Sequence, residues 1–354
     1  MPGGALVWGV GVARPPRLFL VPGPRPREAP LTIRDAARDI IAKFEVLRDF
    51  EGTVRELMTA HEAKRPLWFP HDLIGPGPDQ PVEEHRKQAR KRAEGIPVPA
   101  RAAVALNLLT EEGLPHFHRV FAAHAGEDSH WRDWLNLWTA EEDRHGQVLH
   151  DYVRDTGILD QRKLEEIQFE YMRAGFNPSW DKDPYRVFVY TSVQERATQR
   201  SHSETGRIVA EYDPQLGSVL EKVAQEEARH FTFYRAVFSE VLKRDPNNGL
   251  ESASHILPGI DMPGVTIPGF RDFAEVIRRA GIYGPRDYLK IVQEQIAFWK
   301  VEKLEGLNEM GRKAQERIMA VPDRLRRIAD LIETRSRAKT FTFEVVFNRE
   351  FAME

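Results

Sequence analysis

The chain has 354 residues, of which 41% are hydrophobic and 30% are charged, and its formal net charge is -3. This small net charge gives no reason to expect nucleic-acid binding. The chain has no cysteine, which excludes disulfides, thiolate zinc sites, cysteine-bound iron–sulfur clusters and thiol nucleophiles. Any bound metal would therefore need His and carboxylate ligands. No apolar run approaches the roughly 18 residues of a membrane-spanning helix, so we expect no membrane span.

The first 30 residues are rich in proline and arginine, and we expect a flexible extension there, before a single domain over residues 31–354. Arg14 follows the apolar stretch instead of preceding it, which argues against a signal peptide. The first serine is Ser129, which argues against a plastid transit peptide. A cytoplasmic location is the default expectation.

Helical patterns dominate the rest of the chain. Apolar residues recur at helical spacing from Ile33 to Phe50, whereas residues 66–81 hold five prolines and two glycines and predict a loop. Further helices are predicted over 82–94, 100–124, 131–155, 160–174, 183–210, 214–242, 271–280, 285–305 and 309–332. Residues 244–270 predict a long connection, and only Thr340–Phe351 alternates like a strand pair. The sequence therefore predicts an all-α bundle with a small C-terminal β-hairpin.

Two of the predicted helices carry the motif Glu-x-x-His, at Glu142–His145 and at Glu227–His230. Residues i and i+3 share a helix face, so each pair can present an oxygen and a nitrogen to one point. A third copy, Glu127–His130, lies in a connector that contains Gly and Asp, and we interpret it as a coincidence.

The spacing of two further glutamates strengthens the motif. Glu111 precedes Glu142 by 31 residues, and Glu195 precedes Glu227 by 32. This internal repeat matches the four-helix di-iron carboxylate layout, in which two helices supply one Glu each and two supply Glu-x-x-His. Four carboxylates and two imidazoles suit iron or manganese. The alternative is ordinary surface residues, but carboxylates on such apolar helices are costly unless they are paired or metal-bound.

Longer blocks around these residues resemble a known family. Thr-Glu-Glu-Gly-Leu-Pro at 110–115, Trp-Thr-Ala-Glu-Glu-Asp-Arg-His-Gly at 138–146, Tyr-Thr-Ser-Val-Gln-Glu-Arg-Ala-Thr at 190–198 and Glu-Glu-Ala-Arg-His at 226–230 are similar to signature blocks of the soluble acyl-[acyl-carrier-protein] desaturases. The resemblance extends to residues 68–72, 299–304 and 347–350, and covers about residues 33–352.

This resemblance implies a ferritin-like four-helix bundle with additional helices, and an enzyme that inserts a cis double bond into a saturated acyl chain carried on acyl carrier protein. It implies two Fe ions per chain, O2, a ferredoxin-type electron donor and a homodimer. By motif position, Glu111 and Glu195 resemble the terminal carboxylates, Glu142 and Glu227 the bridging ones, and His145 and His230 the nitrogen ligands.

The resemblance also implies roles around the metals. Glu226 stands where the family has an Asp in its proposed electron-transfer path, and Trp68 and Trp138 are expected near that path; their alternative role is core packing. Thr198 is one turn after Glu195, and the matching family position is thought to deliver a proton. Alternatively, its hydroxyl bonds a carbonyl of its own helix.

Two substrate-related regions follow from the same comparison. Val120, Ala123, Val187 and Phe188 align with the closed end of the acyl tunnel, where a small residue is common at the position of Val187. Because acyl carrier protein is acidic, we expect basic residues to bind it, unless these residues form an ordinary solvated face. The candidates are Lys64, Arg65, Arg86, Lys87 and Arg90.

Three alternatives stay open at this point. The first is another di-iron carboxylate oxidase, such as a hydroxylase, an N-oxygenase or a ribonucleotide reductase small subunit. The second is an iron-storage protein on a ferritin-like scaffold. The third is a family member that has lost activity, against which the complete set of six ligands argues.

Overall fold

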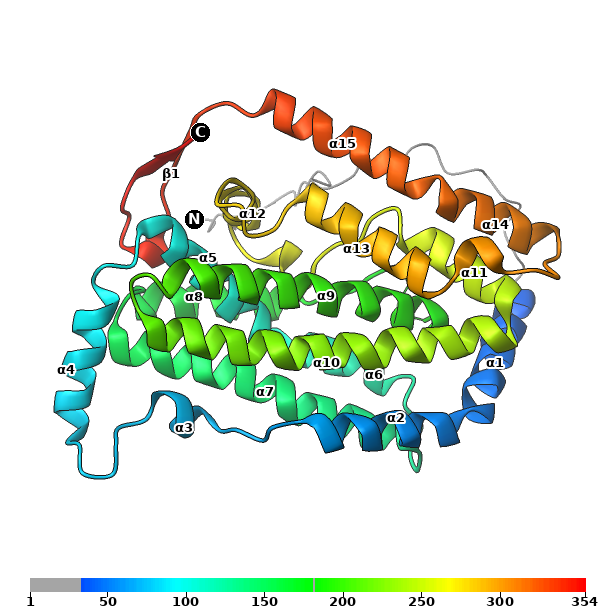
Figure 1. The fold of residues 1–354 in the computed structure, drawn as a ribbon, viewed down its shortest axis with the longest axis horizontal. Coiled ribbons are helices and arrows are strands. Elements are labelled where there is room, and N and C mark those ends of the chain that lie inside the picture. Colours follow the sequence, from blue (N-terminus) through cyan, green and yellow to red (C-terminus); the bar gives the residue numbers. More distant parts are fainter. Residues whose placement is uncertain (1–32, 181) are drawn as a thin grey trace, which may run out of the picture.

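Four helices form the centre of the molecule: α5 (Val98–Glu111), α7 (His130–Thr156), α9 (Pro184–Val209) and α10 (Pro214–Arg244) (Figure 1). This computed structural model describes residues 33–180 and 182–354, so the predicted extension at 1–30 lies outside the described residues. The expected all-α bundle with additional helices is confirmed. Among the described residues, no helix is both long and apolar enough to cross a membrane.

The start of three helices follows from a repeated Asp-Pro pair. Asp183, Asp213 and Asp245 cap α9, α10 and α11 (Pro246–Ile256), and each carboxylate accepts a backbone N–H of the first turn. The proline that follows suits the first helical position, where no N–H is needed. The long connection predicted over 244–270 therefore contains a helix, which Pro246 begins.

The predicted helix over 100–124 is broken into α5 and α6 (Leu114–Ala122). Pro115 cannot continue α5, because its ring would clash with the carbonyl four residues earlier. A side chain on Gly113 would collide with the Tyr171 hydroxyl, so the break depends on that glycine. Pro322 divides the predicted helix over 309–332 for the same steric reason, into α14 (Glu309–Met319) and α15 (Val321–Arg335).

The remaining helices surround the bundle. In Figure 1, α1 (Ile33–Asp49) lies at the right-hand end of the bundle, α2 (Glu51–Lys64) and α3 (Pro70–Ile74) run along the bottom, and α4 (Val82–Ala93) lies at the left. The predicted loop over 66–81 thus contains one short helix. The other helices are α8 (Gln161–Ala174), α12 (Phe270–Arg279), α13 (Pro285–Phe298) and the 3-10 turns η1 (Pro263–Thr266), η2 (Val301–Lys303) and η3 (Glu344–Val346).

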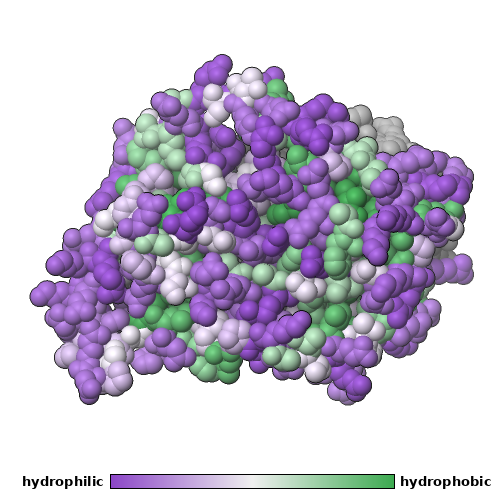
Figure 2. All heavy atoms as spheres, viewed as in Figure 1, coloured by the Kyte–Doolittle hydropathy of each residue, from purple (hydrophilic) through white to green (hydrophobic). Residues whose placement is uncertain are grey.

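The C-terminal strands are shorter than the sequence pattern predicts. β1 (Lys339–Phe341) and β2 (Phe351–Met353) pair antiparallel, with Thr340 opposite Ala352. The residues between them turn through η3, whose Val345 and Val346 are buried in the core. Hydrophilic residues cover much of the face shown in Figure 2, including the projecting corner formed by α4.

Candidate metal centre

The six predicted ligands come together in the middle of the bundle, one Glu each from α5 and α9 and a Glu–His pair each from α7 and α10. They form two overlapping groups: Glu111, Glu142, His145 and Glu227, and then Glu142, Glu195, Glu227 and His230. All are at most 8% exposed. His145 Nδ1 lies 3.5 Å from Glu227 Oε1, and His230 Nδ1 lies 2.8 Å from Glu142 Oε1.

This geometry fits two cations better than it fits a protein-only cluster. Within the described part of the chain, the inner atoms Glu195 Oε2 and His145 Nδ1 are buried without a hydrogen-bond partner. Glu142 Oε1 and His230 Nδ1 are also buried, and their 2.8 Å contact lacks the alignment of a hydrogen bond. Burial raises the pKa of Glu195 well above its usual range, and the nearby Glu227 and Glu142 raise it further. Buried carboxylates in such an arrangement need positive charge between them. The donor set of carboxylate oxygens and imidazole nitrogens suits iron or manganese.

The outer nitrogen of each His is held by a second glutamate. His145 Nε2 lies 3.1 Å from Glu226 Oε2, and His230 Nε2 lies 2.8 Å from Glu141 Oε2. An ionised carboxylate only accepts hydrogen bonds, so each Nε2 donates and each Nδ1 is left free to bind a metal.

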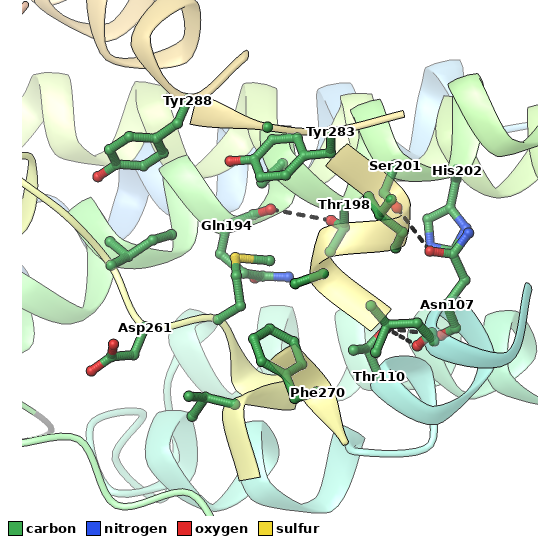
Figure 3. Close-up of a pocket in the computed structure, with 18 of the residues that line it drawn as sticks. Asn107, Thr110, Gln194, Thr198, Ser201, His202, Asp261, Phe270, Tyr283 and Tyr288 are labelled. Carbon is green, nitrogen blue, oxygen red and sulfur yellow. Dashed lines mark hydrogen bonds between the residues drawn. The ribbon is translucent and has the colours of Figure 1, made fainter. Parts of the chain in front are cut away.

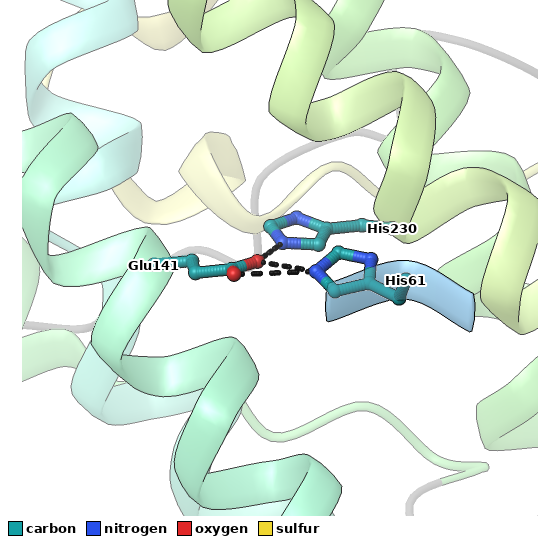
Figure 4. A group of neighbouring side chains, drawn as sticks. All are labelled: His61, Glu141 and His230. Carbon is teal, nitrogen blue, oxygen red and sulfur yellow. Dashed lines mark hydrogen bonds and ion pairs between the residues drawn. The ribbon is translucent and has the colours of Figure 1, made fainter. Parts of the chain in front are cut away.

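Glu141 was not predicted from the sequence, although it is 1% exposed and is central to the site (Figure 4). Besides His230, it accepts hydrogen bonds from His61 Nε2 at 2.9 Å and from Arg65 Nη1 at 2.8 Å. Burial alone would raise the pKa of Glu141, but the bonds from His230 and His61 outweigh burial and lower it far below its usual range. The internal repeat could have revealed Glu141, because Glu141 directly precedes the first Glu-x-x-His motif as Glu226 directly precedes the second.

Trp68 lies against the His145 side of the site. Its ring stacks on the His145 ring with centroids 6.3 Å apart, and the Arg144 guanidinium lies 4.9 Å from its centroid. Arg144 also donates to Glu226 at 3.0 Å. One contiguous group therefore contains Trp68, Arg144, Glu226 and His145. Trp138 is not part of this group. Trp138 lies one turn before Glu142 on the other side of the site, and its Nε1 donates to Glu195 at 3.2 Å.

Polar residues of α9 surround Glu111 and Glu227. Thr198 Oγ1 lies 2.9 Å from Glu227 Oε2 and 3.0 Å from the carbonyl of Glu195, so the hydroxyl contacts a candidate ligand as well as a carbonyl of its own helix. His202 donates to Glu111 at 2.7 Å. Burial would raise the pKa of Glu111, but the neighbouring His145 and His202 rings lower it to about 2. His202 was not predicted, although its position two turns after Glu195 places it on the ligand face.

A cavity of about 440 Å³ lies beside the candidate ligands, and Figure 3 shows part of its lining. Its walls are mainly apolar and come from α5, α6, α7, α9, α12, α13 and α15. The lining includes Leu106, Leu114, Phe117, Trp138, Met262, Phe270, Ile277, Tyr288, Leu325 and Ile332. Glu111, Glu142 and Glu227 are also among the lining residues. The site can therefore hold an extended apolar molecule beside two metal positions.

The four residues predicted for the closed end of an acyl tunnel do not line this cavity. Val120, Val187 and Phe188 are buried in the core, and Ala123 is exposed. The space between the cavity and this region is filled by aromatic rings, since Phe121 packs edge-on against Trp138 at 5.2 Å. Helix periodicity identified the ligand-facing side of α9, but it could not reveal this packing.

The residues predicted to bind the partner do not line the cavity either. Lys64 and Lys87 are exposed, Arg65 pairs with Glu141, Arg86 with Asp155, and Arg90 donates to the Asp155 carbonyl. The sequence interpretation missed a basic groove, formed by α12, α15 and β1, that shares Ile332 with the cavity. Its basic residues are Arg278, Arg279, Arg335, Arg337 and Lys339. Glu275, which also lines the groove, pairs with Arg278 and Arg279, and Asp272 pairs with Lys339. Glu127 is exposed in the connector before α7, outside the candidate ligand groups.

The chain is similar in sequence to known proteins. A family model described as fatty acid desaturase matches residues 42–347. The chain is 31% identical over 343 residues to the chloroplastic stearoyl-[acyl-carrier-protein] 9-desaturase of Gossypium hirsutum, which covers 92% of this chain and 86% of the relative. It is 31% identical to the protein of the same name from Spinacia oleracea, over 87% of this chain and 82% of the relative.

A solved structure also supports the fold. The X-ray structure of DesA2 from Mycobacterium tuberculosis matches with a TM-score of 0.54 at 18% identity, over 76% of this chain and 99% of that chain. The sequence match is long, includes both Glu-x-x-His motifs and agrees with the buried ligand groups. The chain therefore belongs to the fatty acid desaturase family.

Proposed function

We propose that this protein is an acyl-[acyl-carrier-protein] desaturase that uses O2 and two iron ions to introduce a double bond into a saturated acyl chain. Relatives named as desaturases of acyl carrier protein substrates support the reaction class. The observation that carries the proposal is that two overlapping ligand groups adjoin a mainly apolar cavity. A storage site needs no such cavity, whereas an acyl chain does.

Glu111 and His145 would hold one iron, Glu195 and His230 the other, with Glu142 and Glu227 shared between them. When bound, the pair of irons supplies the oxidising power to remove hydrogen from an unactivated methylene, which no side chain possesses. The side chains of the protein orient the substrate, exclude water and transfer protons.

The cavity walls orient the substrate and exclude water from the reacting carbons. Thr198 holds a hydroxyl proton between Glu227 and its own helix, where it can pass a proton into the site. His61 and Arg65 act through Glu141, and Arg144 acts through Glu226, to fix the two imidazole rings.

Electrons would enter on the Trp68 side from a ferredoxin-type donor. Trp68 is 5% exposed, and it connects the surface around α3 to His145 through stacked rings and through Arg144 and Glu226. Trp138 is assigned to the substrate cavity instead, because it lines that cavity and bonds to Glu195.

Acyl carrier protein would dock at the basic groove beside the cavity, between α12, α15 and β1. There its acidic surface would lie beside Ile332, which lines both the groove and the cavity. Electrostatic attraction at such a rim raises the rate of association. Lys64, Arg65, Arg86, Lys87 and Arg90 lie on or beside α2 and α4, which contribute no residue to the cavity. We also propose a homodimer in the cytoplasm, which size measurement in solution and localisation of a tagged chain would test.

The direct test is to incubate the iron-loaded protein with reduced ferredoxin, O2 and saturated acyl carrier protein substrates. The expected result is a monounsaturated acyl product, detected by mass spectrometry, that depends on O2 and disappears in Glu142→Ala. Iron mineral without any oxidised acyl product would instead support storage.

A further inference from the structure

Three tryptophans lie along one face of α7 and end at the candidate ligands. Trp131, Trp134 and Trp138 precede Glu142 by eleven, eight and four residues, and steps of three and four residues stay on one face of a helix. Trp134 and Trp138 are buried, whereas Trp131, in the first turn of α7, is half-buried. We call these three residues the tryptophan stripe. It runs from the metal centre to the outside of the protein.

The inner end of the stripe contacts two candidate ligands. Trp138 Nε1 donates to Glu195 Oε1 at 3.2 Å, and the Trp134 ring lies edge-on to the His230 ring with centroids 6.2 Å apart. Trp138 also lines the cavity. The chain has no cysteine, so no thiol competes for oxidation. When no acyl chain fills the cavity, an easily oxidised indole is therefore in direct contact with the site.

Neighbouring rings connect the members of the stripe. Phe121 lies 5.2 Å from Trp138 and 5.8 Å from Tyr234, and Tyr234 lies 5.8 Å from Trp134, measured between ring centroids. Trp131 and Trp134 are three residues apart on α7, so their side chains are neighbours on the helix surface. Because electron transfer slows steeply with distance, this series of short steps favours the stripe as a path for electrons.

Charge distinguishes the stripe from Trp68, which also contacts a candidate ligand. Oxidation of an indole by one electron gives a radical cation, which a nearby carboxylate stabilises and a nearby cation destabilises. Trp138 is hydrogen-bonded to the Glu195 carboxylate, whereas the Arg144 guanidinium lies 4.9 Å from the centroid of the Trp68 ring. An oxidising metal centre therefore takes an electron from Trp138 more easily than from Trp68.

From these observations we infer that the tryptophan stripe protects the enzyme by donating electrons to the metal centre when O2 has reacted there without a substrate. This inference rests on the proposed function, which supplies the iron pair and O2. The stripe is thus a second electron path, separate from the Trp68 side and used only when the reaction has no acyl chain to oxidise.

The electrons and protons of this reaction balance. The ferredoxin-type donor supplies two electrons when it reduces the iron pair, and in desaturation the acyl chain supplies the other two together with two hydrogens. Without an acyl chain, two electrons leave Trp138 one at a time, and each hole passes through Trp134 to Trp131. There the ferredoxin-type donor or a small reductant of the ascorbate class refills it. With four protons from water, O2 then leaves as two water molecules.

Peptide mapping of tryptophan oxidation tests the path in the holoenzyme. The iron-loaded protein is taken through repeated cycles of stoichiometric dithionite and O2 without acyl substrate, and oxidised tryptophans are located by mass spectrometry. The inference predicts oxidation at Trp131 far above that at Trp180, a half-buried tryptophan outside the stripe. Ascorbate, or a saturated acyl carrier protein substrate, should suppress the oxidation of Trp131.

Two outcomes of this mapping count against the account in different ways. Equal oxidation of Trp131 and Trp180, as a diffusing oxidant would give, would overturn the inference and leave the proposed function intact. An iron-loaded protein that takes up no O2 after reduction would overturn the proposed function, and the inference with it.

Variants in the middle of the stripe separate electron transfer from packing. A Phe ring resists oxidation whereas a Tyr ring does not, so Trp134→Phe should abolish the oxidation of Trp131 and Trp134→Tyr should restore part of it. Trp299→Phe is the matched control, because Trp299 is buried against Phe238 at 4.6 Å outside the stripe. This control should leave the oxidation of Trp131 unchanged. Iron content and thermal unfolding establish that each variant is folded.

Freeze-quench EPR of the wild type gives a second measurement that needs no variant. Samples frozen soon after the reduced enzyme meets O2 without substrate should contain an organic radical, and its signal should narrow when the protein carries ring-deuterated tryptophan. A signal that deuterated tryptophan leaves unchanged, or undiminished oxidation of Trp131 in folded Trp134→Phe, would overturn the inference.

Discussion

Replacing Glu141 with Gln tests how the protein prepares a His ligand. The substitution keeps the size of the side chain but removes its charge and converts one acceptor oxygen into a donor amide. Three donors meet that carboxylate, His230 Nε2 at 2.8 Å, His61 Nε2 at 2.9 Å and Arg65 Nη1 at 2.8 Å. An amide cannot accept from all of them, so at least one donor is left facing another donor.

The size of the effect follows from burial. Glu141 is 1% exposed, and breaking one side of a buried ion pair costs about 3–5 kcal/mol, because the other charge remains without its partner. Loss of the partner that orients a metal-binding His lowers metal affinity by about 10–100-fold. We therefore expect Glu141→Gln to lower both the free energy of unfolding and the affinity for iron, through misorientation of His230.

Iron affinity is measured by competition with a chelator, and stability by denaturant unfolding of the metal-free protein. Glu127→Gln is the matched control, since it makes the same chemical change at an exposed position outside the candidate site. Iron affinity within threefold of the wild type in Glu141→Gln would refute the reasoning that this carboxylate orients His230.

Thr198→Val keeps the branched shape and removes the hydroxyl, so desaturation should fall at least tenfold while iron content is unchanged. Normal turnover in this variant would mean that the hydroxyl serves only to bond its own helix. Glu142→Ala removes an oxygen from both ligand groups, so iron content and product formation should both be lost. Glu127→Ala should keep both. Iron that mass spectrometry still detects in Glu142→Ala would contradict the ligand assignment. Arg335→Glu should raise the KM for acyl carrier protein several-fold at low salt and less at high salt, because ions screen the attraction. Lys87→Glu on α4 should leave the KM unchanged. Equal changes in KM for the two variants would place docking elsewhere.

The ligand set could be predicted because helix geometry and the internal repeat encode it locally. Glu142 and His145 are three residues apart on one helix, and Glu227 and His230 repeat the pair. Glu141 could have been predicted from the same repeat, as the counterpart of Glu226. By contrast, no local pattern relates His61 to Glu141, which are 80 residues apart in sequence and meet only when α2 packs on α7.

The acyl cavity shows the opposite case. The spacing of Val187 and Phe188 from Glu195 predicts that they share a face of α9 with that glutamate. A helix face is exposed to a cavity, however, only if no other helix fills the space. Here Phe121 of α6 and Tyr234 of α10 supply the filling rings, with centroids 5.8 Å apart. Similarly, the basic groove combines residues of α12, α15 and β1 that are dispersed in the sequence, whereas the dense charge run of α4 drew attention first.

The central claim is that two buried metal positions beside an apolar cavity remove hydrogen from an acyl chain. Its most direct measurement is the mass of the product formed from a deuterated saturated acyl carrier protein substrate under 18O2, with reduced ferredoxin. The account predicts an unsaturated chain that has lost two vicinal deuterium atoms and carries no 18O. An 18O-labelled alcohol on the acyl chain, or an unchanged chain beside precipitated iron, would contradict it.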